Sequence, residues 1–194
     1  MIPERFLVIN LLVFLLIPVI IMFYSPGSLL QTLATTLTGI IYITTPLILL
    51  MYIPFQGLNY DPFLITALFV IIWIYDSLAY LTGSIAGRTK LAPKISPSKS
   101  WEGFAGGVIL TVVLIWLGRN GNIIHRDIPW IAFSLILIVS ATLGDLFEST
   151  LKRRAGVKDS GSLIPGHGGI LDRFDSVLFA APVAFVFLRI ICEI

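Results

Sequence analysis

The sequence has little charge, a single cysteine and no Walker-A motif. Only 12% of its 194 residues are Asp, Glu, Lys or Arg, whereas a soluble domain carries about twice that share and needs it to cover its surface. Cys192 stands alone, which excludes an intramolecular disulfide and a cysteine-based metal site. Without Walker-A spacing, a P-loop nucleotide site is excluded as well. An ordinary soluble enzyme therefore does not fit this composition.

Long hydrophobic runs take the place of charge. Hydrophobic residues make up 57% of the chain, and runs of about 20 residues recur, the length that a helix needs to cross a bilayer. An open sheet would leave its backbone groups unpaired in lipid. We therefore predict an all-α, polytopic integral membrane bundle of about six transmembrane helices. The expected spans are 5–24, 29–53, 62–86, 103–118, 128–150 and 174–193.

The first run is expected to be a retained transmembrane helix, because it is long for a signal peptide and no small-x-small cleavage site follows it. Two connectors, 87–102 and 151–173, hold nine of the thirteen Lys and Arg residues. The positive-inside rule places both connectors in the cytoplasm. Counting back through six spans then puts both termini outside.

Ionisable residues inside predicted spans are functional candidates, because their burial in lipid is costly. Asp76 lies in the middle of the third span, and Asp145 and Glu148 lie near the cytoplasmic end of the fifth. Two structural alternatives stay open: Glu148 could pair with Lys152 one turn later, and Asp76 could accept a hydrogen bond from Tyr80. No such partner for Asp145 occurs on its own helix.

The segment 149–175 combines basic residues, glycines and carboxylates. Glycines around His167 allow backbone N–H groups to approach an anion closely. Asp172 and Asp175 share one face of the first turn of the last span, where capping of the helix dipole is the structural alternative. Carboxylates beside Lys and Arg suit Mg²⁺ holding a polyphosphate. Phosphoryl-type transfer needs mainly positioning and charge neutralisation, which these residue types supply.

The spacing in this segment resembles the motif of the phosphatidate cytidylyltransferases, also called CDP-diacylglycerol synthases. The matching residues are Ser149, Lys152, Arg153, Lys158, Asp159, Pro165, Gly166, His167, Gly168, Gly169, Asp172, Arg173 and Asp175. A second block resembles the same family through Asp76, Ala79, Tyr80, Gly83, Gly87, Arg88, Lys90, Ile95, Lys99, Ser100, Glu102 and Gly103. The resemblance covers roughly residues 70–178. It implies a catalytic transmembrane domain at 61–194, preceded by motif-free transmembrane helices at 1–60.

The resemblance implies transfer of a cytidylyl group from CTP to phosphatidate, giving CDP-diacylglycerol and pyrophosphate for phospholipid biosynthesis. It implies Mg²⁺, with a second metal such as K⁺. Asp145 and Asp172 are the first-choice metal ligands, followed by Asp175, Asp159 and Glu148. The catalytic set expected to neutralise or contact phosphates is Lys152, Arg153, Lys158 and His167. The set expected to bind cofactor or nucleotide is Ser149, Gly166, Gly168, Gly169, Arg173, Lys99 and Asp76.

The first cytoplasmic connector, with Ser96, Lys99, Ser100 and Glu102, either seats the nucleotide or lipid headgroup or is an ordinary positive-inside loop. Glycines at 83, 87, 103, 106 and 107 suit close helix packing.

The expected partners are CTP, phosphatidate and the lipid bilayer, without nucleic acid, and family analogy suggests a homodimer. The expected location is the cell inner (plasma) membrane, with the active site on the cytoplasmic side. Rival interpretations are another CTP-using enzyme, such as a polyprenol or phytol kinase or an archaeal-lipid cytidylyltransferase, and an ion-coupled transporter using Asp76 and Asp145.

Overall fold

The computed structural model describes residues 28–56, 59–121, 128–162 and 168–190. By internal contacts the chain divides into two compact units, Met1–Thr45 and Pro46–Ile194. The boundary falls inside helix α2 (Leu29–Tyr52). Every element that bears on the predicted site belongs to the second unit.

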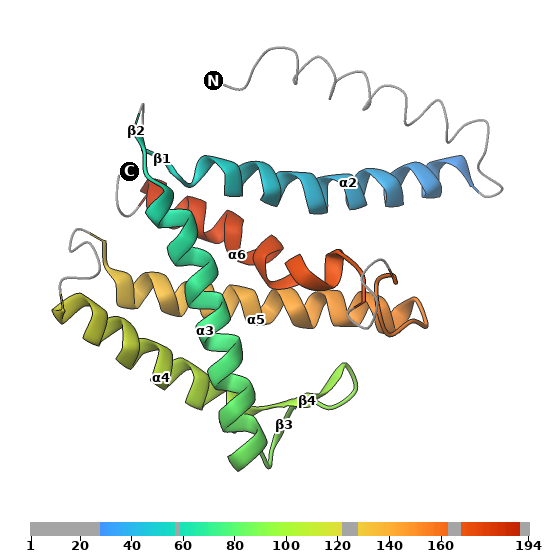
Figure 1. Cartoon of the computed structure of the whole chain (residues 1–194). Helices are drawn as coiled ribbons and strands as arrows, with labels where there is room; N and C mark the ends of the chain where they lie inside the picture. Colours follow the sequence, from blue (N-terminus) through green and yellow to red (C-terminus); the bar gives the residue numbers. More distant parts are fainter. Residues whose placement is uncertain (1–27, 57–58, 122–127, 163–167, 191–194) are drawn as a thin grey trace. The chain divides into compact units, whose positions relative to one another are not determined.

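The second unit is a helical bundle with two short β-hairpins (Figure 1). After α2 come β1 (Phe55–Gln56), β2 (Asn59–Tyr60), α3 (Pro62–Ala86), β3 (Lys90–Ala92), β4 (Ser96–Ser100), α4 (Trp101–Asn120), α5 (Trp130–Arg154) and α6 (Leu171–Ile190). The polar connector before α4 contains a short hairpin that the sequence analysis did not predict. There β3 and β4 pair antiparallel, with Lys90 opposite Ser100 and Ala92 opposite Ser96.

Four helices in the described part are long and apolar enough to span a membrane, which confirms the all-α, polytopic membrane fold. They are Leu30–Tyr52, Pro62–Ala86, Trp101–Asn120 and Trp130–Arg154. The span predicted at 5–24 lies outside the described residues. The predicted sixth span corresponds to α6, whose charged residues keep it out of this group, so the count of six is not confirmed.

Capping residues fix where two of these helices begin. The Asp61 carboxylate accepts a hydrogen bond from the Phe63 N–H at 2.9 Å, and Pro62 occupies the first turn of α3. The Ser100 hydroxyl accepts one from the Gly103 N–H at 3.1 Å at the start of α4. Both side chains satisfy backbone donors that the first helical turn leaves unpaired.

Glycines let α3 and α4 approach closely, as the sequence predicted. A Cβ atom on Gly103 would lie 2.8 Å from the backbone oxygen of Ala79, and one on Gly107 would lie 2.8 Å from the Ala79 Cβ. Neither contact leaves room for a side chain. Small residues of this kind are how membrane helices bring their backbones together.

Helices α5 and α6 form the other closely packed pair. A Cβ on Gly144 would lie 2.6 Å from the Asp175 backbone oxygen and 2.9 Å from the Phe179 Cβ. Phe133 and Leu137 on α5 are fully buried in the core. The pair of helices therefore meets tightly next to Asp145, the residue after Gly144.

Candidate active site

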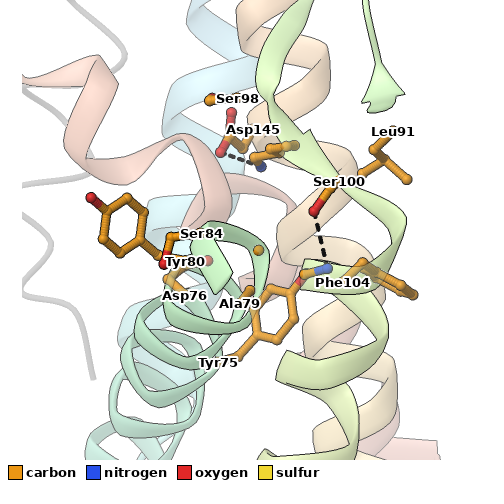
Figure 2. A pocket seen from close by; sticks show the side chains of 13 residues that line it. Tyr75, Asp76, Ala79, Tyr80, Ser84, Leu91, Ser98, Ser100, Phe104 and Asp145 are labelled. Carbon is orange, nitrogen blue, oxygen red and sulfur yellow. Dashed lines mark hydrogen bonds and ion pairs between the residues drawn. The ribbon is translucent and has the colours of Figure 1, made fainter. Parts of the chain in front are cut away.

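A cavity of about 310 Å³ lies among α3, β4, α4 and α5. Its polar lining includes Asp76 from α3, Ser98 and Lys99 from β4, and Asp145 from α5 (Figure 2). Three segments that are distant in sequence therefore bring their ionisable side chains to one place. This meeting of Asp76, Lys99 and Asp145 is the first part of the candidate site.

Asp145 is paired with a lysine from the hairpin. The Lys99 ammonium contacts its Oδ2 atom, shown by the dashed line at Asp145 in Figure 2. The Ser149 hydroxyl, one turn along α5, donates to its Oδ1 atom at 3.2 Å. Sequence reasoning found nothing on its own helix that neutralises the charge of Asp145, and the cation that does so comes from β4.

Asp76 lines the same cavity and is exposed there. The alternative in which Tyr80 satisfies its carboxylate is not supported, because Tyr80 is 79% exposed and points outward in Figure 2. The charged groups close enough to act on Asp76 are Lys99, Asp145 and Asp175. Asp76 thus shares the cavity with Lys99 and Asp145.

Lys152 joins the end of α5 to the start of α6. Its Nζ atom lies 2.7 Å from Glu148 Oε2 and 2.7 Å from Asp172 Oδ1. The predicted pair of Glu148 and Lys152 is therefore present, but it is half of a bridge between two helices. Glu148 is fully buried, and its Oε1 atom has no hydrogen-bond donor among the described residues.

The carboxylate of Asp172 also organises the loop before α6. Its Oδ2 atom accepts hydrogen bonds from the Ser160 N–H and hydroxyl, both at 2.9 Å, and from the Gly169 N–H at 2.7 Å. Gly168 adopts a φ of +83°, and a Cβ there would lie 2.7 Å from Asp172 Oδ2. Within the described loop the glycines thus wrap the protein's own carboxylate. Ser160 was missed by sequence reasoning because the quoted motif specifies no residue at that position.

The remaining predicted residues surround this bridge or fall outside the described ranges. Arg153 donates to backbone oxygens, from Nε to Ile95 at 3.4 Å and from Nη1 to Val157 at 3.3 Å. Exposed positions on the loop and the first turn of α6 are occupied by Lys158, Asp159 and Arg173. Gly166 and His167 lie outside the described residues, so their roles stay predictions.

Asp175 connects the two groups of carboxylates. It lies where α6 packs against α5, since a Cβ on Gly144 would lie 2.6 Å from its backbone oxygen. Its Oδ1 atom accepts a hydrogen bond from the Ser176 N–H at 2.6 Å inside the second turn of α6, so it does not cap the start of the helix. The carboxylates of α5 and α6 therefore form one continuous acidic region.

The donor set fits a magnesium ion chemically. No three Asp, Glu, His or Cys side chains converge on one point in the described part of the chain. Mg²⁺ does not require such a cage, because it takes one or two protein carboxylates and completes its shell with phosphate oxygens and water. Asp145 offers hard oxygen ligands at the edge of an open cavity. The metal ligands predicted from the sequence stay predictions.

Residues 2–191 match the cytidylyltransferase family. The chain belongs to this family. It is 43% identical over 169 residues to the phosphatidate cytidylyltransferase of Haemophilus influenzae, covering 82% of this chain and 57% of that protein. It is 39% identical over 178 residues to that of Thermotoga maritima (86% and 63%) and 47% identical over 138 residues to that of Bacillus subtilis (68% and 51%).

The resemblance found in the motifs is thereby confirmed. The match covers only about half to two-thirds of the length of these three relatives.

Proposed function

We propose that the protein transfers the cytidylyl group of CTP to phosphatidate, releasing pyrophosphate and forming CDP-diacylglycerol. The main support is that one cavity is lined by Asp76, Lys99 and Asp145, which come from three separate segments. This cavity adjoins the acidic region of α5 and α6. The relatives named phosphatidate cytidylyltransferase support the same reaction.

The charge of this region fits a substrate that arrives with a cation. Its carboxylates are those of Asp76, Asp145, Glu148, Asp172 and Asp175, and its ammonium groups are those of Lys99 and Lys152. Because carboxylates outnumber the two ammonium groups here, we expect a nucleotide to enter more favourably together with a divalent ion.

Magnesium bound at Asp145 and Asp172 would neutralise triphosphate charge and make the α-phosphorus a better electrophile. Lys99 and Lys152 supply cationic donors that can pass from carboxylate to phosphate oxygens when the substrates enter. The phosphatidate phosphate is already ionised and attacks without a general base. The protein thus contributes mainly alignment and charge compensation.

The basic connectors support a location of the site at the cytoplasmic face of an inner membrane. Lys99 lies on one of these connectors, and Lys152 and Asp172 lie at the ends of the other. Placement of these positive segments inside follows from the charge bias of membrane topology. Family analogy adds a homodimer to the proposal.

The test uses the purified chain in detergent with phosphatidate, Mg²⁺ and CTP labelled at the α-phosphorus. The label should enter the lipid fraction as CDP-diacylglycerol, with pyrophosphate released in equal amount. Asp145→Asn and Asp172→Asn should each reduce the rate at least about 100-fold, because each removes charge used in the transition state. Transfer of a γ-phosphate label to a lipid alcohol would identify a kinase and overturn the proposal.

A further inference from the structure

One carboxylate closes the base of the β3–β4 hairpin. The Oε2 atom of Glu102 accepts a hydrogen bond from the Arg88 N–H at 3.1 Å, and both its oxygens lie 3.1 Å from the Thr89 N–H. The Trp101 N–H donates to the Thr89 carbonyl at 2.9 Å beside them. The chain that leaves α3 is thereby fixed to the chain that enters α4.

The fixed base lies directly next to Lys99. Lys90 pairs with Ser100 in the hairpin, and Ser100 is 5% exposed because its hydroxyl caps α4. Lys99 precedes Ser100 and reaches across to Asp145 on α5. Its backbone is therefore held by the hairpin base, while its side chain spans the cavity.

The far end of the hairpin is held less firmly. Its turn is joined to α5 by the hydrogen bond from Arg153 Nε to the Ile95 carbonyl, at 3.4 Å. A hydrogen bond of this length is weak. By contrast, Glu102 makes charge-assisted bonds to two consecutive N–H groups, which are stronger than neutral ones.

We propose that Glu102 is a positioning residue, which closes the hairpin base and so holds Lys99 against Asp145. This inference rests on the proposed function for its catalytic consequence, although the placement of Lys99 can be measured without any substrate. Sequence reasoning offered Glu102 as a group that seats the nucleotide or headgroup. Its two oxygens are instead engaged by backbone donors.

The direct test measures the chemical reactivity of Lys99 in detergent, without substrate. Reductive methylation is followed by mass spectrometry, and the exposed Lys94 on the same hairpin is the internal reference. In Glu102→Ala the Lys99-to-Lys94 ratio should rise about two- to fivefold, the factor expected for loss of a partly exposed ion pair. Glu102→Gln should give a smaller rise, because its amide oxygen still accepts.

The matched control is Asp61→Ala. Asp61 also uses its carboxylate to hold a backbone N–H at a helix start, but at the opposite end of α3. The Lys99-to-Lys94 ratio of this variant should equal that of the wild-type protein. An unchanged ratio in folded Glu102→Ala would overturn the proposal. If Glu102→Ala does not elute as a folded protein in gel filtration, Glu102→Gln takes its place. A Lys99-to-Lys94 ratio in Glu102→Gln equal to that of the wild-type protein would then overturn the proposal.

Activity supplies the second readout through a double-mutant cycle. If Glu102 acts through Lys99, the Glu102→Ala/Lys99→Ala protein should be no slower than Lys99→Ala alone, within about twofold. If the rate losses of the two single variants multiply in the double variant, Glu102 acts independently of Lys99, and the proposal is contradicted. Absence of CDP-lipid formation in the unmodified protein would refute the proposed function only, because the labelling result does not depend on turnover.

Discussion

Replacing Lys152 by methionine should destabilise the protein by removing the cation between two carboxylates. The Nζ atom lies 2.7 Å from both Glu148 and Asp172, and the three side chains are 16%, 1% and 11% exposed, respectively. Methionine keeps most of the length of the aliphatic chain. The change therefore tests the charge and its hydrogen bonds more than the packing.

The expected loss follows from what each carboxylate retains. Asp172 keeps its donors from Ser160 and Gly169, so its charge stays compensated. Glu148 keeps no hydrogen-bond donor among the described residues. Breaking a buried pair from one side costs about 3–5 kcal/mol. Because only one of the two carboxylates is left without a partner, we expect about 3 kcal/mol, or about 6–12 °C in melting temperature for a chain of this length.

A second substitution separates charge from side-chain loss. Glu148→Gln added to Lys152→Met removes the uncompensated charge and should recover about half of the loss or more. The matched control is Lys99→Met, whose pair with Asp145 is 27% exposed on both sides. Loss of that pair should cost about 1 kcal/mol or less.

The assay is thermal unfolding in one detergent, followed by tryptophan fluorescence and by loss of the monodisperse peak. The reasoning would be refuted if Lys152→Met melted no lower than Lys99→Met. It would also be refuted if the double variant melted below Lys152→Met alone.

Two further changes probe packing and a buried hydrogen bond. Gly144→Ala should lower stability, because its Cβ would lie 2.9 Å from the Phe179 Cβ and overpacking costs about 1–3 kcal/mol against about 1 gained in helix propensity. Gly39→Ala should be neutral or stabilising, because a Cβ there would meet no other atom of the described residues within 4 Å, and equal melting temperatures of the two variants would contradict this. Tyr75→Phe removes a 2.9 Å hydrogen bond to Thr142, whose hydroxyl still donates to a carbonyl one turn earlier. The loss should be about 0.5–1.5 kcal/mol by chemical unfolding, and more than 3 would contradict this.

The helices were predictable because their signals are local. Asp61 and Pro62 mark the start of α3, and the structure gives Pro62–Ala86, the span expected from hydropathy. The β3–β4 hairpin was missed because Ser96–Ser100 reads SPSKS, a polar run without the alternation that indicates a strand. Glu102 closes that hairpin, and no sequence pattern predicts that its side chain accepts hydrogen bonds from the backbone of Arg88 and Thr89.

Among the contacts that join the predicted site residues, only the local one could be predicted from the sequence. Glu148 and Lys152 are one helical turn apart, so their contact could be expected from spacing alone. The contacts of Asp145 with Lys99 and of Asp172 with Lys152 join different elements. Such pairs depend on how α5 meets the hairpin and α6, which no local pattern encodes.

These pairings bear on how a site of this charge would select its ligand. Lys99 and Lys152 already occupy the two carboxylates predicted to hold the metal, Asp145 and Asp172. A lone divalent cation would have to displace both ammonium groups, which would leave Lys99 without its pair and Lys152 with Glu148 alone. When a triphosphate arrives together with the cation, its oxygens offer the lysines new partners. Under the proposed function, this arrangement would therefore favour binding of the metal–nucleotide complex over binding of either component alone.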